Sequence, residues 1–386
     1  MSAFIDIFSK SLTKYGEELC GDKFKILKTE DKAIIVISDG LGSGIKAHIL
    51  ATLTSDIISI MLKADISFEE VVDTVLHTLP VCKIRKIAYA TFTIIEVERK
   101  TNNFKVINFD NPAVFLVKNG KVQSSKTNTI EILNKKITIL EGKLEKGDFL
   151  AAITDGILYA GIGLSSSFGW HWEDIARYIE NLLITHSTNA RNIINELSNK
   201  TSTLYKGKMG DDVTMVGLYA RERSQLIMFS GPPENENLND IYTELFFMFN
   251  GRHVVCGGTT TNIVANRLGE EVEVFLSTIT NDIPPIGKLS GVDLVTEGIV
   301  TITKCIEYLK NAEGDARNLP DIINAAVILA KELLRADYIY IIVGLGINKA
   351  SQIYIQTTKI SVRKKLMLDL ANILQESNKE VVINFC

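Results

Sequence analysis

The sequence predicts two domains of different classes, an α+β sandwich over residues 1–222 and a smaller α/β domain over residues 223–386. The length of 386 residues exceeds the roughly 100 to 150 residues of a typical domain. Extended apolar runs follow one another before residue 222, whereas strand-like and helix-like runs alternate after it. Near Glu222 a charged stretch gives way to one apolar strand and then to Gly-Pro-Pro, which marks the boundary.

The first domain contains mostly predicted strands, because its apolar runs are rich in β-branched and aromatic residues and are bounded by turn residues. Asn119-Gly120 lies between two such runs and predicts a two-residue hairpin turn, since both positions need a positive φ. Hairpins in series indicate mostly antiparallel sheets. The predicted strands cover Ala33–Ser38, Ala88–Val97, Phe104–Phe109, Ala113–Lys118, Ile137–Leu140, Phe149–Thr154 and Val213–Tyr219.

Three helices interrupt these strands. Ser67 followed by Glu70 is a capping-box pattern that predicts a helix start, and apolar residues recur at helical spacing from Trp172 onward. A third helix follows Gly44, and its apolar side chains predict a face that is buried in a core. That predicted face consists of Ile45, Ile49, Leu53, Ile57, Ile60 and Met61.

The second domain alternates predicted strands with predicted helices, which is typical of an α/β fold. The predicted strands are Leu226–Ser230, His253–Gly257, Val272–Leu276, Tyr338–Val343 and Val381–Phe385. The predicted helices are Asp240–Phe249, Thr260–Leu268, Gly298–Lys310, Pro320–Arg335 and Val362–Glu376.

The composition excludes several classes of function. With 42 Lys+Arg against 46 Asp+Glu, the net charge of −4 gives no basic surface for nucleic acid or an anionic membrane. No apolar run is long enough to span a membrane, and the N-terminal segment lacks the apolar core of a signal peptide. The cysteines are odd in number and scattered, which predicts a reducing, cytoplasmic environment. They are Cys20, Cys82, Cys256, Cys305 and Cys386.

Three aspartates stand at the ends of predicted strands in the first domain. Asp39 and Asp155 each end an apolar run and precede glycine, and Asp211 precedes the strand that starts at Val213. One Asp-Gly pair is most simply a turn. If the third strand is antiparallel, however, all three carboxylates meet at one end of the sheet and repel each other. A hard divalent cation would relieve that repulsion, and oxygen ligands favour Mg²⁺ or Mn²⁺ over zinc.

Five stretches resemble, in the same order, the motifs of the metal-dependent PPM (PP2C-type) phosphatases, in particular the bacterial sporulation-stage-II-E (SpoIIE) branch. The resemblance covers about residues 10–220, and its most specific motif is Asp-Gly-x-Gly-x-Gly followed by a helix. The five stretches are Cys20-Gly21-Asp22, Ser38-Asp39-Gly40-Leu41-Gly42-Ser43-Gly44-Ile45-Lys46-Ala47, Asp110-Asn111-Pro112-Ala113, Thr154-Asp155-Gly156 and Gly210-Asp211-Asp212-Val213-Thr214.

The resemblance implies a PP2C-like β-sandwich flanked by helices, in the order α-β-β-α, with a two-metal centre between the sheets. Asp39 would bridge two Mn²⁺ or Mg²⁺ ions and Gly40 would offer its backbone carbonyl. Asp155 and Asp211 would hold the first ion. Asp22 would act at the second ion, directly or through water. The helix after the glycine loop is either a core helix or, as in this family, a switch that repositions the loop.

The implied activity is that of a protein serine/threonine phosphatase, with a metal-activated water attacking phosphorus and no covalent nucleophile. Asp39, Asp155 and Asp211 are the implied catalytic residues. Asp212, where many relatives carry asparagine, would support the ligands without touching a metal. The implied partner is a phosphoprotein of bacterial signalling, such as an anti-sigma-factor antagonist, and a homodimer is one possible assembly.

The second domain holds one candidate ligand site, at Gly257, Gly258, Thr259 and Thr260. Backbone N–H groups and threonine hydroxyls at the start of a helix could bind a phosphate or a carboxylate. A capped turn between strand and helix explains the same residues equally well. The domain would thus be regulatory or ligand-binding, and the alternative function for the chain is a ligand sensor or scaffold in which the phosphatase half is secondary.

Overall fold

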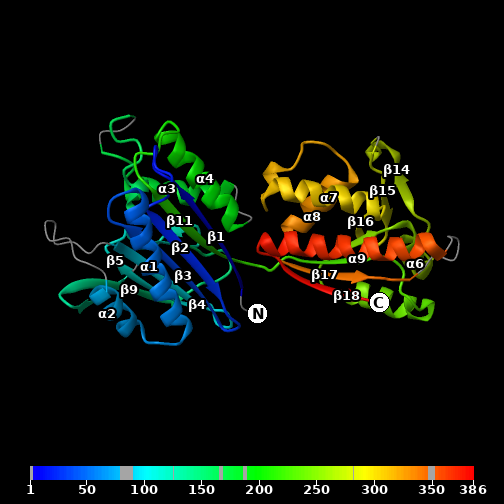
Figure 1. Cartoon of the computed structure of the whole chain (residues 1–386), viewed down its shortest axis with the longest axis horizontal. Coiled ribbons are helices and arrows are strands. Elements are labelled where there is room, and N and C mark those ends of the chain that lie inside the picture. Colours follow the sequence, from blue (N-terminus) through cyan, green and yellow to red (C-terminus); the bar gives the residue numbers. More distant parts are fainter. Residues whose placement is uncertain are drawn as a thin grey trace. The chain divides into compact units, whose positions relative to one another are not determined.

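The structure, a computed structural model, describes residues 3–78, 90–124, 126–164, 168–185, 189–280, 282–346 and 353–386. Cys82 and the first two residues of the strand predicted at Ala88 lie outside these ranges. The chain divides into two compact units, Met1–Glu222 and Arg223–Cys386, and each is described by itself (Figure 1).

The first unit is a sandwich of two β-sheets with helices on both outer faces (Figure 1). Between the sheets lies a core to which one sheet contributes Ile35 and Ile95 and the other Leu150 and Val216. Two helices cover the outer face of one sheet, and two further helices cover that of the other. The predicted α+β class and the implied α-β-β-α order are confirmed.

All neighbouring strands of these two sheets are antiparallel. One sheet has the order β2-β3-β4-β5-β9-β8, with β2 (Asp22–Lys28), β3 (Lys32–Gly40), β4 (Ala90–Glu98), β5 (Asn103–Phe109), β8 (Asn128–Ile132) and β9 (Lys135–Lys143). The other has the order β1-β11-β10-β6-β7, with β1 (Phe4–Leu12), β6 (Phe115–Lys118), β7 (Lys121–Val122), β10 (Phe149–Ile153) and β11 (Val213–Arg221).

Three of these strands, β1, β2 and β8, were not predicted. Each is an edge strand of its sheet. Edge strands carry lysines and other charged residues that prevent further pairing, so their apolar runs are short. The hairpin at Asn119-Gly120 is confirmed, because both residues have a positive φ and β6 pairs with β7 across them.

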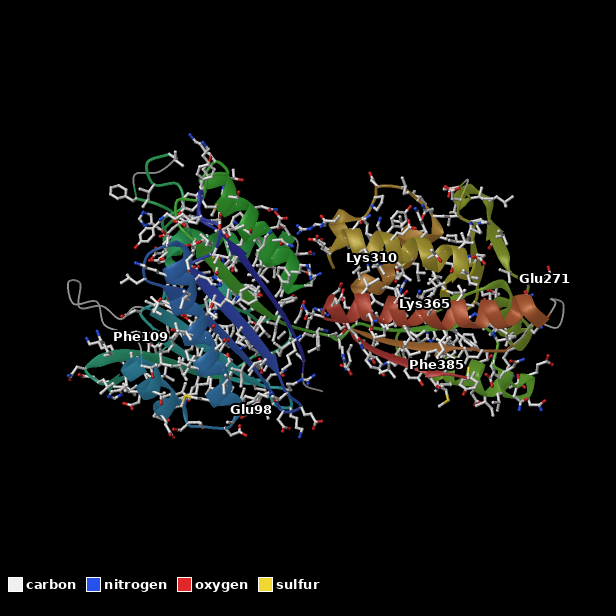
Figure 2. All side chains as sticks on the ribbon, in the orientation of Figure 1. Glu98, Phe109, Glu271, Lys310, Lys365 and Phe385 are labelled. Atoms are coloured by element: carbon white, nitrogen blue, oxygen red, sulfur yellow. The ribbon has the colours of Figure 1, made fainter. Side chains whose placement is uncertain are left out.

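The helices of the first unit are α1 (Gly44–Lys63), α2 (Phe68–Thr78), α3 (Trp172–Thr185) and α4 (Ala190–Leu204). The predicted start of α2 is confirmed, since the Ser67 hydroxyl accepts a hydrogen bond from the backbone N–H of Glu70 at 3.3 Å. Helix α2 packs against the sheet in one core cluster with Phe109, which Figure 2 labels. The ring centroids of Phe109 and Phe92 lie 5.3 Å apart in this cluster. Helix α4 was not predicted, because its sequence is largely polar.

Helix α1 buries a different face from the one predicted. It packs on β3 and β2 mainly through small side chains, which let the helix approach the sheet closely. The buried residues include Ala47, Ala51, Ser55, Ile58, Ser59 and Leu62. The residues Ile45, Ile49, Leu53 and Ile60, which we expected to be buried, are at least half exposed, so that expectation was wrong. Contrary to the expectation that no segment is long and apolar enough to span a membrane, α1 is the one helix among the described residues whose length and composition would allow it.

The second unit is a seven-stranded sheet of the order β14-β15-β16-β13-β12-β17-β18, which confirms the α/β class. The five strands from β16 to β18 are parallel, and β14 and β15 form an antiparallel edge. The strands are β12 (Gln225–Ser230), β13 (Arg252–Cys256), β14 (Glu273–Phe275), β15 (Ile286–Leu289), β16 (Val292–Thr296), β17 (Tyr338–Val343) and β18 (Glu380–Phe385).

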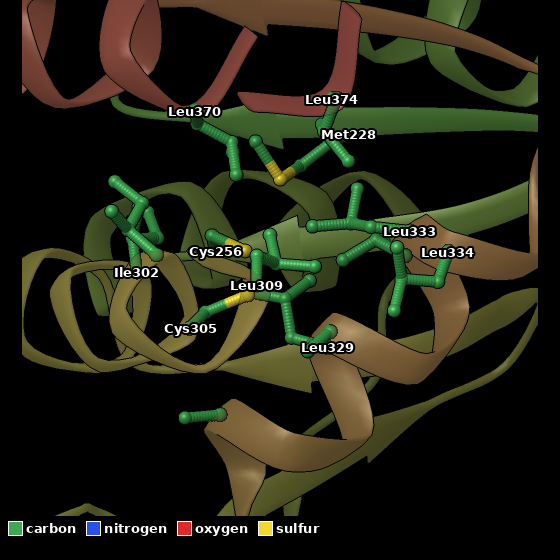
Figure 3. Close-up of a cluster of buried hydrophobic side chains, with 14 of the residues drawn as sticks. Met228, Cys256, Ile302, Cys305, Leu309, Leu329, Leu333, Leu334, Leu370 and Leu374 are labelled. Atoms are coloured by element: carbon green, nitrogen blue, oxygen red, sulfur yellow. The ribbon is translucent and has the colours of Figure 1, made fainter. Parts of the chain in front are cut away.

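Helices cover both faces of this sheet. One face carries α5 (Asn239–Met248) and α6 (Gly258–Leu268). The other carries α7 (Ile299–Ala312), α8 (Ala325–Arg335) and α9 (Ile353–Glu376). Figure 3 shows the core on that second face, where Cys305 and Leu309 of α7 lie beside Cys256 of β13. Helix α8 starts five residues after the predicted start at Pro320, because the Asn324 side chain caps it by accepting from the Val327 N–H.

Candidate metal centre

Two of the predicted aspartates lie on neighbouring strands of one sheet. Asp22 begins β2 and Asp39 stands next to the end of β3, and the two residues are direct partners in the antiparallel pairing. Side chains of directly opposed residues have Cβ atoms only about 5 Å apart, so two carboxylates there repel each other. The pairing therefore places like charges together at a position where neither can move away.

The other two aspartates come from the second sheet. Strand β10 ends at Ile153, and Thr154 and then Asp155 follow it. Asp211 lies two residues before the start of β11. Strands β10 and β11 are antiparallel, so the end of one lies beside the start of the other, as the backbone hydrogen bond from Thr154 N–H to the Thr214 carbonyl (2.9 Å) shows. This is the arrangement that the sequence required for the third carboxylate to reach the same sheet end.

Burial and mutual repulsion disturb the ionisation of all four carboxyl groups. Burial, and then the charges of neighbouring carboxylates, raise the pKa of Asp39 to about 9. Burial likewise raises the pKa of Asp22 to about 7, with Asp212 adding to the effect. The pKa values of Asp155 and Asp211 are raised too, first by burial. Near neutral pH the cluster therefore retains protons that isolated aspartates would have lost.

Asp22 is held from the opposite sheet. Its Oδ2 accepts a hydrogen bond of 2.7 Å from the Thr154 hydroxyl, and the same hydroxyl oxygen accepts from the Thr214 backbone N–H at 2.8 Å. The hydroxyl of Thr214 in turn lies 2.7 Å from that of Ser11 on β1. These bonds join the two sheets at the site and fix the position of the Asp22 carboxyl group.

The glycine of each Asp-Gly pair is required by close backbone contact. A Cβ on Gly40 would lie 2.0 Å from the Ala47 carbonyl oxygen of α1, and a Cβ on Gly156 would lie 2.0 Å from the Asp212 carbonyl oxygen. Neither position could accept a side chain without moving the backbone. The two glycines thus hold the Asp39 loop against α1 and the Asp155 turn against the loop that carries Asp211.

The residues suit a hard cation, although they do not form a finished metal site. Within the described part of the chain, no group of three or more Asp, Glu, His or Cys side chains converges as a metal site would. Instead, after burial, the charges of Asp22, Asp155 and Asp211 each raise the pKa of Asp39, so these carboxyl groups repel one another and a cation could neutralise them. The groups in the cluster are oxygen donors, as Mg²⁺ and Mn²⁺ prefer.

Asp212 is a fifth carboxylate, close enough to Asp22 and Asp211 to raise the pKa of each. It is buried, its Oδ1 accepts a hydrogen bond from the Lys14 backbone N–H at 3.0 Å, and its Oδ2 is an unpaired buried oxygen. The supporting role that we expected for Asp212 stays a prediction.

Two residues next to the cluster were missed or left open by the sequence. Lys14 lies in the loop between the unpredicted strands β1 and β2, and its Nζ is 3.9 Å from the Asp211 Oδ1. The residues around Lys14, before Cys20-Gly21-Asp22, form no pattern that would indicate a contact between Lys14 and Asp211. His48, one turn into α1, has its Nδ1 2.8 Å from the Cys20 carbonyl oxygen and so connects α1 with the loop before Asp22.

The candidate site of the second unit lies at the end of β13 and the start of α6, as predicted. Its buried hydroxyl groups have partners within the protein: that of Thr260 accepts from the Gly231 N–H at 2.8 Å, and that of Thr261 lies 3.0 Å from the Gly257 carbonyl. Gly258 and Thr259 are exposed. The Thr260 bond joins the start of α6 to the residue that follows β12, and no side chain caps α6 at Gly257. The choice between a structural turn and a ligand site stays a prediction.

Comparison with known proteins gives a family and a fold. The family model described as Stage II sporulation protein E (SpoIIE) matches residues 29–221. No curated protein matches the chain. Asp22 lies outside the matched range, whereas Asp39, Asp155 and Asp211 lie inside it.

Solved structures with a similar fold include two of SpoIIE from Bacillus subtilis. The PP2C phosphatase domain with a fragment of the regulatory domain is 19% identical, with a TM-score of 0.50, and the match covers 58% of this chain and 65% of that chain. This chain thus spans slightly less than two thirds of that structure. The phosphatase domain in a crystal form without domain swapping is 20% identical, with a TM-score of 0.45 and coverage of 58% and 95%.

A third similar structure contains the RsbU and RsbW domains of a protein from Mycobacterium tuberculosis. It is 17% identical, with a TM-score of 0.48 and coverage of 64% of this chain and 69% of that chain. At these identities the likeness of the first structure concerns the fold alone, while the family model covers half of the sequence. The chain therefore belongs to the SpoIIE family of PP2C-type protein phosphatases.

Proposed function

We propose that the first unit removes phosphate from phosphoserine or phosphothreonine of a protein, using two Mn²⁺ or Mg²⁺ ions. The observation that carries this proposal is that Asp22, Asp39, Asp155 and Asp211 stand at strand ends of both sheets, where burial and neighbouring carboxylates raise the pKa of each. Buried carboxylates with strongly raised pKa values are characteristic of functional sites. Family membership supplies the reaction class, and the clustered oxygen donors support the divalent ions.

In this proposal Asp39 would serve both ions, Asp155 and Asp211 would hold one of them, and Gly40 would contribute its carbonyl oxygen. Bound ions would activate a water molecule and neutralise charge on the phosphoryl oxygens. Ion binding would require Asp39 to lose its proton, because its pKa is raised to about 9. Thr154 keeps the Asp22 carboxyl in place through its 2.7 Å hydrogen bond. Asp212 holds the loop before β2 by accepting from the backbone at Lys14.

The surroundings of the cluster favour a protein over a small molecule as substrate. Tyr159, whose pKa is raised first by the charge of Asp155, stands beside the carboxylates on a segment with several exposed apolar side chains. Exposed apolar groups gathered near a site are typical of surfaces that bind proteins. The exposed apolar side chains of that segment are Tyr159, Ile162, Leu164 and Phe168. Family membership suggests a bacterial signalling phosphoprotein, such as an anti-sigma-factor antagonist.

The test is Mn²⁺-dependent release of phosphate from para-nitrophenyl phosphate and from a phosphoserine protein. We expect Asp39→Asn and Asp155→Asn each to lower turnover by about 1000-fold or more, since each removes a charge that a divalent ion needs. Asp110→Asn is the matched control, because Asp110 is exposed, has a positive φ that asparagine tolerates, and should keep full turnover. Unchanged turnover in both site variants would refute the proposal.

A further inference from the structure

Lys14 is a cation held in a fixed place at the edge of the acidic cluster. Its backbone N–H donates to the Asp212 carboxylate at 3.0 Å, and the next residue, Tyr15, donates its backbone N–H to the Met209 carbonyl at 2.9 Å. The loop before β2 is thereby attached to the loop that carries Asp211 and Asp212. The position of Lys14 thus follows the position of those two carboxylates.

The ammonium group of Lys14 lies close to the cluster but donates no hydrogen bond to it. Its Nζ lies 3.9 Å from the Asp211 Oδ1, which is beyond hydrogen-bond distance, and about one third of the side chain (35%) is exposed. Within the described part of the chain the ammonium group makes no hydrogen bond, so its donors can serve another acceptor. Since lysine has a flexible stem and three donors, it can follow a ligand that arrives from solvent.

The charges of the site require such a cation when a phosphate group is present. Two divalent ions would balance four of the carboxylates, Asp22, Asp39, Asp155 and Asp211. The buried Asp212 and a dianionic phosphate monoester would then remain unbalanced in a partly buried place. Lys14 supplies positive charge from the side on which Asp211 is exposed to solvent, and lysine is a common partner of phosphate.

From this geometry we propose that Lys14 binds the phosphate group of the substrate and of the released inorganic phosphate. The inference rests on the proposed function of the cluster and names a residue that contacts the substrate. Positioning of Lys14 by Asp212 then gives that buried carboxylate a second task, besides supporting the metal ligands.

The experiment compares Lys14→Gln with Lys14→Arg and with Lys46→Gln. Lys46 is the matched control, because it is an exposed lysine at the start of α1, close to the Asp39 loop, and has no ion pair with the cluster among the described residues. Two quantities are measured for each variant: binding of inorganic phosphate to the Mn²⁺-loaded protein by calorimetry, and product inhibition by phosphate during hydrolysis of para-nitrophenyl phosphate. Mn²⁺ affinity without phosphate is measured in parallel.

We expect Lys14→Gln to weaken phosphate binding and to raise KM by about tenfold or more, as for loss of a charge-assisted hydrogen bond, with a smaller change in kcat. Lys14→Arg should stay within about threefold of the parent, because the charge is kept. Mn²⁺ affinity should be unchanged or tighter in Lys14→Gln, since a cation next to Asp211 has been removed.

Unchanged phosphate affinity in Lys14→Gln overturns the inference, as does a loss confined to Lys46→Gln. Weaker Mn²⁺ binding in Lys14→Gln would also overturn it, because the residue would then serve the loop and not the phosphate. If the parent protein binds Mn²⁺ and phosphate but releases no product, the proposed function fails and the calorimetric comparison still decides the role of Lys14. If the Mn²⁺-loaded parent binds no phosphate, both proposals fail.

Discussion

Both units end their buried strands in glycine turns, but they leave different groups there. In the first unit the turns carry Asp39 and Asp155, whose pKa values are raised because burial and neighbouring carboxylates disfavour their charge. In the second unit the corresponding turn carries Thr260 and Thr261, and both hydroxyls have partners in the backbone around them. The strand ends of the first unit thus hold carboxylates that repel each other, whereas both threonine hydroxyls in the second unit are hydrogen-bonded.

This difference shows how a functional site can be distinguished from a structural turn. Buried polar groups normally find partners during folding, and a turn whose groups are all bonded has nothing left to bind. Buried carboxylates placed directly opposite each other, as Asp22 and Asp39 are, cost stability that folding alone does not return. Such an arrangement is explained when a cation completes it, which is the basis of the proposed function.

The largest expected effect concerns the stability of the metal-free protein as a function of pH. The pKa values of Asp22 and Asp39, about 7 and about 9 when folded, lie above the ordinary value of 3.8. At these two groups the folded state therefore binds more protons than the unfolded state, so their contribution to stability is greatest below about pH 4. It is then lost as pH rises through 7 and 9, by up to about 1.4 kcal/mol per pH unit for each group.

Urea unfolding at pH 5, 7 and 9, with and without Mn²⁺, measures this loss. The transition that Mn²⁺ shifts reports the first unit, and Mn²⁺ should reverse most of its loss of stability at high pH. Asp39→Asn should make the dependence on pH shallower, because one of the titrating groups is gone. A metal-free protein whose first unit gains stability from pH 5 to pH 8 would contradict the account.

A smaller effect is expected at the satisfied strand end of the second unit. Thr260→Val removes the acceptor of the buried Gly231 N–H, so the unfolding free energy should fall by about 1 to 3 kcal/mol. Thr259→Val, at the exposed neighbouring position, should change it by less than about 0.5 kcal/mol. Turnover of para-nitrophenyl phosphate should be the same in both variants. A selective loss of turnover in Thr260→Val would remove the contrast between the two strand ends.

The sequence predicted those parts of the site that have a local signal. Asp39 and Asp155 follow apolar runs and precede glycine, so their place at strand ends could be inferred from neighbouring residues. The hydrogen bond from Thr154 to Asp22 joins residues 132 positions apart, and no local pattern indicates it. Lys14 was missed for a related reason, because the edge strands β1 and β2 on either side of it have short apolar runs.

Helix α1 shows a second limit of sequence patterns. Its large apolar residues predicted the buried face, yet Ile45 is 62% exposed and Ile49 is 50% exposed, while Ala47 and Ala51 are fully buried. Periodicity of large side chains identifies a buried face only when the helix packs at the usual distance. Here the Asp39 loop and the helix touch through Gly40 and Ala47, so the start of α1 buries small side chains, and large ones such as Ile58 are buried further along the helix.

A last pair of variants tests that difference within α1. Ile49→Lys should change the unfolding free energy by less than about 0.5 kcal/mol, because its side chain is half exposed. Ile58→Ala, at a fully buried position of the same helix, should cost about 2 to 5 kcal/mol. Thermal or urea unfolding compares the two variants. If Ile49→Lys were as destabilising as Ile58→Ala, the exposed apolar face of α1 would have to be covered in the folded protein.

The central claim, that the four aspartates form a centre for two divalent ions, is tested most directly by calorimetric titration of the metal-free protein with Mn²⁺. The account predicts two ions bound per chain, with release of protons at neutral pH because Asp22 and Asp39 must ionise. It also predicts that Asp39→Asn lowers the number of ions bound. Failure of the parent protein to bind Mn²⁺, or the same two-ion binding in Asp39→Asn, would contradict it.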